Sequence, residues 1–329
     1  MSQPIFALTL AVLVPFASAL PQAGDRKNDP QEDLPDSLEI PSATALTPTE
    51  ELATFELPKG YEIRLAAAEP LVVDPVQITF DELGRMWVVE MRGFMRDADG
   101  SGELDPTGVI AILSDDDGDG VMDRREVFAD ELVLPRGVYP MAGGALCVLP
   151  PELVFLRDDD GDGELDLREV VATGLTQGLN NPEHAINSPA MGLDGWIHFA
   201  NWDRRVRRVF DGDGQPVWET QAVRGGGQWG LSIDEKGRPL RNTNSNPLYI
   251  DAVPGHYARR NKNQRRFHGA FTRVDAKNAT FPSRINPGVN RGYKPGTLGD
   301  DYRLARFTGA CAPTFLGGDA LGVLSLIHI

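Results

Sequence analysis

An internal repeat restricts the possible folds of this chain more than any other feature. The segment Ile-Ala-Ile-Leu-Ser-Asp-Asp-Asp-Gly-Asp-Gly, which begins at Ile110, returns at Leu153 as Leu-Val-Phe-Leu-Arg-Asp-Asp-Asp-Gly-Asp-Gly, 43 positions later. A period of about 40–45 residues is what a four-stranded propeller blade needs. A β-sandwich also has short strands and turns, but it gives no reason for this self-similarity. The repeat therefore predicts an all-β fold, a β-propeller.

A second recurring unit consists of a strand, an Asp/Gly turn and another strand. It occurs at residues 80–90, 192–201 and 233–240. Such turns use Gly and Asp because these residues tolerate positive φ. The 35 Gly and 25 Pro of the chain support many turns. The strand pairs amount to about four blades and the start of a fifth, so we expect a propeller truncated after about four to five blades.

The net charge of −16 limits the classes of partner. A nucleic-acid binder needs Lys and Arg against the phosphates, so no nucleic-acid partner is expected. Acidic residues crowd the region between Asp97 and Glu169. This distribution suits a protein that holds divalent cations.

The two Asp-rich loops match the calcium-loop spacing D-x-D-x-D-G-x5-E. Calcium takes six to eight oxygen ligands, and this spacing wraps alternate carboxylates around one ion, with position 7 offering its backbone carbonyl. Because the flanking residues are strand-like, we expect the ion to staple a turn between two strands instead of acting as a sensor. The predicted ligands are Asp115, Asp117, Asp119, Val121, Asp123 and Glu126 in the first loop and Asp158, Asp160, Asp162, Glu164, Asp166 and Glu169 in the second.

Two other acidic stretches match the pattern less well. Residues 97–105 have the front half of a calcium loop, but Gly108 stands where the final Glu should be. Residues 211–214 (Asp-Gly-Asp-Gly) are interpreted as a plain turn.

The N-terminus has the features of a signal peptide. Residues 5–17 are apolar but too few to span a bilayer comfortably, and Ala17-Ser18-Ala19 is a small-x-small cleavage pattern. The alternatives are a buried strand or an uncleaved anchor. We expect residues 1–19 to be a signal peptide, 20–50 a disordered linker, 51–323 the incomplete propeller and 324–329 a sequence artefact. The protein would be periplasmic or extracellular, with no transmembrane segment after cleavage.

Four motifs resemble a known family. They are residues 180–200 (NNPEHAINSPAMGLDGWIHFA), 224–231 (RGGGQWGL), 242–247 (NTNSNP) and 310–313 (ACAP). From about residue 51 to 323 the chain resembles the bacterial membrane-bound dehydrogenase propeller family, which is related to the soluble PQQ-dependent glucose and sorbosone dehydrogenases. The resemblance implies a six-bladed propeller and a sugar or other alcohol as substrate.

The resemblance also implies site residues. His184 corresponds to the general base that accepts the substrate hydroxyl proton, and Arg224 and Gln228 to contacts with PQQ, although extra glycines separate these two residues. Asn242, Asn244 and Asn246 correspond to a loop whose oxygens help to hold the catalytic calcium, and Asn244 and Asn246 are the predicted cofactor-binding residues of this loop. Each has an ordinary alternative: His184 as a capped loop residue, Arg224 as the partner of a surface carboxylate, and the Asn residues as a turn.

Many family members carry a downstream cytochrome c domain with a Cys-x-x-Cys-His haem site. The only cysteines here are Cys147 and Cys311, so haem c is expected only in a missing downstream domain. The two thiols either form one disulfide or stay unpaired. The resemblance thus implies a calcium- and PQQ-dependent oxidoreductase with a cytochrome c electron acceptor. The alternative is a non-catalytic propeller that binds carbohydrate or protein partners at the cell surface.

Overall fold

The computed structural model describes residues 37–39, 44–97, 99–163, 165–175, 179, 181–260, 263, 269–274, 279–280, 285 and 296–317. The chain divides into two units. The first comprises Met1–Ser42 and Thr280–Arg306, and the second comprises Ala43–Ala279 and Phe307–Ile329. The predicted signal peptide and the predicted artefact at residues 324–329 lie outside the described residues, as does most of the predicted linker.

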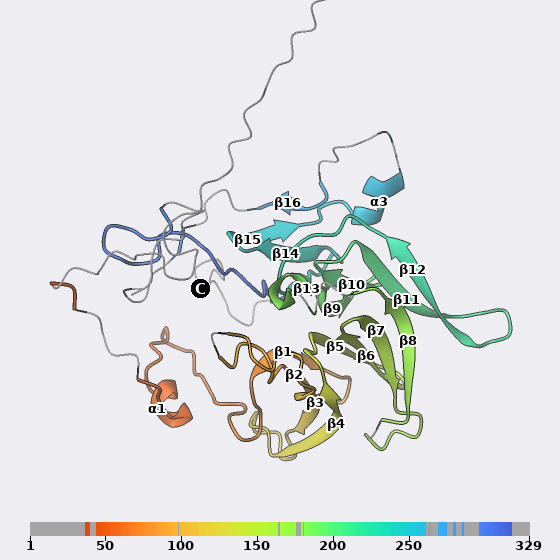
Figure 1. The fold of residues 1–329 in the computed structure, drawn as a ribbon, viewed down its shortest axis with the longest axis horizontal. Coiled ribbons are helices and arrows are strands. Elements are labelled where there is room, and N and C mark those ends of the chain that lie inside the picture. The colour runs from red at the N-terminus through yellow and green to blue at the C-terminus, as the bar shows by residue number, and fades with distance from the viewer. Residues whose placement is uncertain are drawn as a thin grey trace, which may run out of the picture. The chain divides into compact units, whose positions relative to one another are not determined.

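The second unit contains four sheets of four antiparallel strands, each in simple sequential order (Figure 1). The strands are β1 (Pro75–Phe80), β2 (Met86–Glu90), β3 (Gly108–Ser114), β4 (Arg124–Leu132), β5 (Gly137–Met141), β6 (Gly144–Leu149), β7 (Glu152–Arg157), β8 (Leu167–Thr173), β9 (Asn187–Met191), β10 (Ile197–Ala200), β11 (Arg204–Phe210), β12 (Pro216–Ala222), β13 (Leu231–Ile233), β14 (Pro239–Thr243), β15 (Asn246–Ile250) and β16 (Thr272–Arg273). We call these sheets blades 1 to 4.

The first strands of successive blades pack against one another: β1 against β5, β5 against β9, and β9 against β13. The amide of Gln77 on β1 links the first pair. It donates to Val138 O at 3.1 Å and accepts from Val138 N at 2.7 Å. Sequential four-stranded meanders that meet along their first strands form a β-propeller, which confirms the predicted fold. Four blades lie in the described part of the chain.

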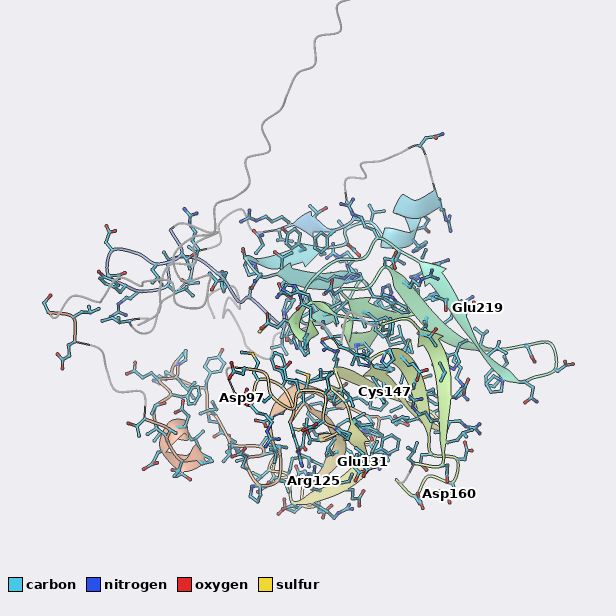
Figure 2. The ribbon with its side chains drawn as sticks, viewed as in Figure 1. Asp97, Arg125, Glu131, Cys147, Asp160 and Glu219 are labelled. Carbon is cyan, nitrogen blue, oxygen red and sulfur yellow. The ribbon has the colours of Figure 1, made fainter. Side chains whose placement is uncertain are left out.

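The hydrophobic core lies between the blades. Strand β6 is buried on both sides: Ala145 and Cys147 belong to a cluster shared with blade 1, whereas Leu146 and Val148 belong to a cluster shared with blade 3. This arrangement explains why the middle strands are nearly continuous apolar runs instead of alternating ones. Figure 2 shows Cys147 among the side chains of the sheets.

A segment N-terminal to the blades covers the other face of blade 1. Ala66, Ala67, Leu71 and Val72 pack against a buried cluster that includes Met86. Backbone contacts reinforce this packing, since Met122 N donates to Ala66 O at 2.8 Å.

Helices are few in the described residues. Helix α1 (Pro48–Leu52) has a complete capping box between Thr47 and Glu50, and α3 (Gly255–Arg260) lies against β12. In the first unit, isolated bridges join Ile285 to Arg303 and Leu298 to Leu304.

Candidate functional site

The connections between strands separate the predicted site residues into two groups. Because neighbouring strands of a blade are antiparallel, the hairpins after the first and third strands lie at one end of the blade, and the remaining connections lie at the other. Both Asp-rich loops follow a third strand, between β3 and β4 and between β7 and β8. We call this end the acidic-loop end. His184, Arg224 and Gln228 lie between blades, and Asn244 lies between β14 and β15, so all four belong to the opposite end.

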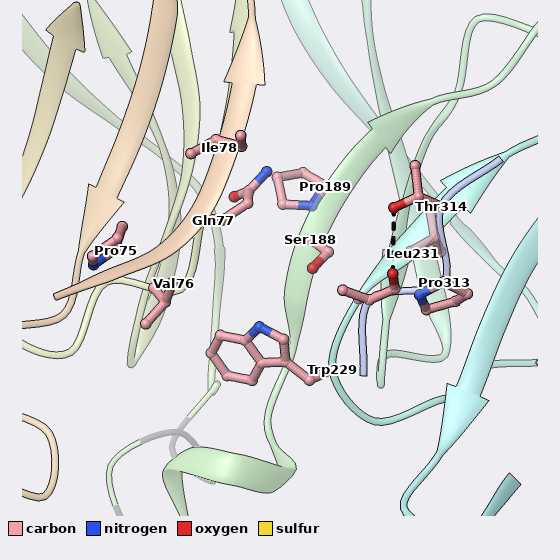
Figure 3. A pocket seen from close by; sticks show the side chains of 12 residues that line it. Pro75, Val76, Gln77, Ile78, Ser188, Pro189, Trp229, Leu231, Pro313 and Thr314 are labelled. Atoms are coloured by element: carbon pink, nitrogen blue, oxygen red, sulfur yellow. Dashed lines mark hydrogen bonds between the residues drawn. The ribbon is translucent and has the colours of Figure 1, made fainter. Parts of the chain in front are cut away.

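A cavity of about 400 Å³ lies at the inner strands (Figure 3). Its walls come from β1, from the start of β9, from the loop that leads into β13, and from a segment after the blades. The lining residues are Pro75, Val76, Gln77, Ile78, Ser188, Pro189, Trp229, Gly230, Leu231, Ala312, Pro313 and Thr314. Trp229 lies on the connection between blades 3 and 4, and Ser188 lies just after the connection between blades 2 and 3. The cavity is therefore at the same end of the blades as His184 and Gln228.

The lining residues combine one large aromatic ring with uncharged polar groups. Trp229 presents its indole, and Gln77, Ser188 and Thr314 supply amide and hydroxyl groups. None of the twelve lining side chains is charged. A site of this composition suits a neutral ligand that offers both an apolar surface and hydroxyl groups.

Three residues around the cavity adopt left-handed backbone conformations. Ser188 has φ of 48°, Ala312 has φ of 50° and Gly230 has φ of 95°. For non-glycine residues such a conformation costs about 1–3 kcal/mol and is concentrated at functional sites. Glycine is also needed at position 230 for space, because a Cβ there would lie 2.3 Å from Ala312 Cα. Two strained non-glycine residues at one cavity support a functional role for it.

The predicted base His184 ends a short 3-10 helix, η1 (Pro182–His184), four residues before Ser188. It is half-buried, and its backbone N donates to Asn181 O at 3.1 Å. His184 is not among the residues that line the cavity. Its turn is held by Arg136, a fully buried residue that donates to Pro182 O, and burial lowers the pKa of Arg136 to about 10. Arg136 was not predicted as a site residue, because its partner Pro182 is distant in the sequence.

The predicted cofactor contacts Arg224 and Gln228 lie on the loop that leads to β13. Arg224 is exposed and does not line the cavity, and its backbone N donates to Gly255 O at 3.3 Å beside α3. Gln228 is half-buried next to Trp229, and its backbone carbonyl accepts from Asn187 Nδ2 at 2.6 Å. Gln228 thus lies beside the cavity, and its backbone carbonyl helps to hold the loop that carries the lining residue Trp229.

The Asn residues surround the turn between β14 and β15. Asn246 Nδ2 donates to Thr243 Oγ1 at 3.2 Å, and Asn244 O accepts from Ala310 N at 3.1 Å. The contact between Asn246 and Thr243 closes the hairpin turn, whereas the bond from Ala310 ties this turn to the segment after the blades.

Each Asp-rich loop gathers three carboxylates. Oxygen atoms of Asp115, Asp117 and Asp119 lie within 4.8 Å of one another, as do those of Asp158, Asp160 and Asp166. Figure 2 places Asp160 on the loop between β7 and β8. Three hard oxygen donors at this spacing could hold a divalent cation such as calcium.

Backbone N–H groups shape these loops. Gly120 N and Gly118 N donate to the Asp115 carboxylate at 2.8 and 2.7 Å, and these bonds, with that of Gly120 foremost, lower the pKa of Asp115. In the second loop Gly161 N and Gly163 N donate to Asp158 at 2.7 and 3.2 Å. The Asp115 carboxylate therefore stays ionised at neutral pH, and the first-position carboxylate of each loop organises that loop through these hydrogen bonds.

Other predicted ligands lie outside the two three-carboxylate groups. Asp123 Oδ2 accepts from Asp116 N at 2.8 Å, and Glu126 lies on β4, where it pairs with Arg124. Val121 N donates to Asp119 Oδ1 at 2.8 Å. Asp162 and Glu169 also lie outside the groups, the latter on β8. Glu164 is outside the described residues.

The two weaker acidic stretches form turns. Asp97 Oδ1 accepts from Asp99 N and Ser101 N at 3.0 and 2.9 Å. Asp211 Oδ1 accepts from Asp213 N and Gln215 N at 2.9 and 2.8 Å in the β11–β12 hairpin, which confirms the predicted turn.

A polar network around the buried His198 in blade 3 was not predicted. His198 on β10 is 7% exposed, and its Nε2 lies 3.6 Å from Asp194 Oδ1. Burial lowers the pKa of His198. The Asp/Gly turn within residues 192–201 was predicted from the sequence, but a role for His198, four residues after Asp194, was not.

The two cysteines are both free, with Cys147 buried and Cys311 exposed. Of the two alternatives considered for these residues, the structure shows unpaired thiols, of which only Cys147 is buried.

Comparisons with known proteins identify the family. Residues 47–327 match the family described as "Domain of unknown function (DUF7133)". The chain belongs to this family. No curated protein matches the sequence of this DUF7133 member. The described part of the chain has no helix of the length and apolar character that a membrane crossing requires.

Several solved structures are similar to the DUF7133 chain. The holo pyranose dehydrogenase PQQ domain from Coprinopsis cinerea has 15% identity and a TM-score of 0.39, covering 74% of this chain and 56% of its own. A luciferin-regenerating enzyme has 9% identity and a TM-score of 0.34, covering 54% and 55%. Catalytically inactive virginiamycin B lyase from Staphylococcus aureus has 13% identity and a TM-score of 0.31, covering 56% and 53%. The chain spans about half the length of these structures.

Proposed function

We propose that this DUF7133 chain is a calcium-stabilised β-propeller that binds a sugar or another neutral alcohol in the cavity at its inner strands. The observation that carries the proposal is the lining itself: the Trp229 indole beside the Ser188 and Thr314 hydroxyl groups, with no charged side chain among the lining residues. Sugar rings have apolar faces and hydroxyl edges, which match an aromatic surface and nearby hydrogen-bonding groups.

The strained backbone of two lining residues also supports this cavity as the binding site. Ser188 and Ala312 keep left-handed conformations although neither is glycine. Such conformations are costly and cluster at binding and active sites, where they hold side chains in fixed positions. The cavity therefore has features of a site prepared for a ligand.

The binding proposal is tested by isothermal calorimetry on the full chain with a panel of monosaccharides and polyols. At least one compound should bind, and Trp229→Ala should abolish the heat. Phe210→Ala is the control, because Phe210 is 75% exposed at the end of β11 next to the acidic-loop-end hairpin. An absence of binding across the panel would refute the proposal.

The calcium part of the proposal rests on the two three-carboxylate groups. Each lies in a hairpin that joins the third and fourth strands of a blade, away from the cavity. A cation there would neutralise the carboxylates and fix the hairpin, so its role would be structural.

A second candidate function is oxidation of the bound alcohol by a PQQ-dependent dehydrogenase with cytochrome c as electron acceptor. The observation in its favour is His184, a half-buried histidine at the cavity end, four residues before Ser188. A histidine can act as a general base near neutral pH. Under this second candidate function, the chain is one of the membrane-bound dehydrogenase propellers, and haem c is carried by a downstream domain.

The lining residues do not fit PQQ. This cofactor has three carboxylates, which call for cationic partners, and no lining side chain is cationic. Arg224, the predicted partner, is exposed and lies outside the lining. The test is to add calcium and PQQ to the protein and to measure dye reduction with the same panel. Sugar-dependent reduction that disappears in His184→Asn would establish the oxidoreductase. Sugar binding without reduction would favour the non-catalytic propeller.

We further propose that the protein is exported to the periplasm or beyond. Support comes from the apolar residues 5–17 followed by Ala17-Ser18-Ala19. N-terminal sequencing of protein from the native host should give a chain that begins near Leu20. A mature chain that retains residues 1–19 would contradict export by cleavage.

A further inference from the structure

We infer that Asn187 is the positioning residue of the cavity: its buried amide fixes the loop that carries Trp229. Asn187 begins β9 and is fully buried. It lies 43 positions from Gly230 in the sequence, on a different blade. Its significance for ligand binding rests on the proposed function, but its effect on the loop does not.

All four hydrogen-bonding positions of the Asn187 amide are occupied. Nδ2 donates to Gln228 O at 2.6 Å and to Ala185 O at 2.8 Å. Oδ1 accepts from Gly230 N at 3.0 Å and from Ser188 Oγ at 2.9 Å. A carboxamide has two N–H donors and two acceptor lone pairs, so no capacity is left over. Only Asn supplies this set at this length.

The Asn187 contacts flank Trp229 on both sides. The carbonyl before it and the N–H after it are bound to Asn187, and its own carbonyl accepts from Ala312 N at 2.8 Å. Three backbone groups of residues 228–230 are therefore fixed by contacts with residues distant in sequence. The indole of Trp229 is consequently presented to the cavity from a rigid loop (Figure 3).

The same amide also reaches two other parts of the cavity end. Ser188, which lines the cavity in a left-handed conformation, donates its hydroxyl to Asn187 Oδ1. Ala185, which follows His184, offers its carbonyl to Asn187 Nδ2. One buried side chain thus connects the His184 turn, Ser188 and the Trp229 loop.

The test uses the full chain with 5-fluorotryptophan, in which the 19F resonance of Trp229 is assigned from Trp229→Phe. Asn187→Asp should shift or broaden that resonance, because a carboxylate cannot donate to Ala185 O and Gln228 O. With glucose as the probe, its Kd should rise about tenfold, which corresponds to about 1.4 kcal/mol. The Trp87 resonance, from the core between blades 1 and 2, should stay in place and report an intact fold.

Gln221→Glu is the matched control. Its Oε1 accepts from Arg205 on the neighbouring strand at 3.0 and 2.6 Å, and a carboxylate keeps this role, so the Trp229 resonance should not move. An unchanged Trp229 resonance in folded Asn187→Asp would overturn the inference. A shifted resonance without any glucose binding in the native chain would sustain it and count against the proposed sugar site.

A measurement on the unaltered protein covers the case in which Asn187→Asp does not fold. The Gly230 amide should exchange its hydrogen as slowly as core-strand amides, because it donates to a buried acceptor. Exchange at the rate of an open loop would overturn the inference.

Discussion

Arg205 on β11 donates from Nη1 to Asp194 Oδ2, 2.6 Å away in the turn between β9 and β10. The same carboxylate lies beside His198. His198 first, and then Arg205, hold the pKa of Asp194 well below its usual range, against the opposing effect of burial. The guanidinium of Arg205 also lies 4.6 Å from the centre of the Trp196 ring. One carboxylate thus connects three strands of blade 3.

Replacing Asp194 with Asn should lower the free energy of unfolding at neutral pH by about 1 kcal/mol. Because the folded pKa is below the unfolded one, the stabilisation by Asp194 is present above about pH 4 and is lost as the pH falls further. The variant should therefore lose less stability than the native chain on acidification. Urea unfolding at neutral pH and at several pH values below 5 measures both effects, and equal acid sensitivity of the two proteins would contradict the assignment.

Calcium should raise the melting temperature, and EDTA should lower it. A ligand at 100 times its Kd stabilises the folded state by about 2.7 kcal/mol. Asp117→Asn combined with Asp160→Asn should remove most of the calcium effect, because each change takes one carboxylate from a group of three. Asp213→Asn is the control, since it changes the corresponding hairpin of blade 3, where no such group lies among the described residues. A melting temperature that ignores calcium would refute the metal sites.

Gly230→Ala should destabilise the protein by about 3 kcal/mol or more. The new methyl group would lie 2.3 Å from Ala312 Cα, and φ is 95°. Gly214→Ala provides the comparison: φ is 74°, but no atom lies within 4 Å of the new Cβ, so the expected cost is about 1 kcal/mol. Equal losses of stability in chemical denaturation would show that the close approach of Gly230 and Ala312 is wrong.

Arg241→Met should cost about 3–5 kcal/mol, because it leaves a buried charge without its partner. Arg241 Nη1 donates to Asp251 Oδ2 at 2.7 Å, and both side chains are 2% exposed. The double variant Arg241→Met with Asp251→Asn should recover part of the loss, since no unpaired charge remains. A double-mutant cycle measured by urea unfolding determines the coupling. No recovery would mean that the pair contributes through packing alone.

A thiol reagent should modify one cysteine in the native protein and two after unfolding. Cys311 is exposed, whereas Cys147 is fully buried and burial raises the pKa of its thiol. Mass spectrometry should locate the native label at Cys311. Two rapid labels in the native state would contradict the burial of Cys147, and none would indicate a disulfide.

The sequence was informative where structure depends on local spacing. The Asp-rich loops and the Asp/Gly turns each lie within about a dozen residues, and they became the hairpins of the blades as predicted. The 43-residue period then predicted one four-stranded sheet for each repeat. These features predicted the propeller without any knowledge of distant contacts.

The cavity could not be predicted in this way, because its contacts join distant positions. Gln77 meets Val138 across 61 positions, and Asn187 meets Gly230 across 43. In the sequence, nothing distinguishes Gln77 or Asn187 from an ordinary polar residue near the start of a strand. The same is true of Arg136, whose partner Pro182 is 46 positions away.

The calcium-loop spacing was only partly realised for a physical reason. In a helix-flanked loop the residue at position 12 turns back towards the ion. Here β4 begins at Arg124, so Glu126 lies on an extended strand and pairs with Arg124 instead. The pattern thus pointed to the carboxylates that lie together in each loop, Asp115, Asp117 and Asp119 in the first and Asp158, Asp160 and Asp166 in the second, whereas the final Glu belongs to neither group.

The hairpin between β11 and β12 is a suitable place to attach the protein to a surface. It lies at the acidic-loop end, and its turn is closed by Asp211 through local hydrogen bonds only. A peptide tag or a surface linker inserted there would anchor the protein by the end opposite its cavity. An immobilised protein would then present the Trp229 loop to solution, so that soluble compounds could reach it in a capture experiment.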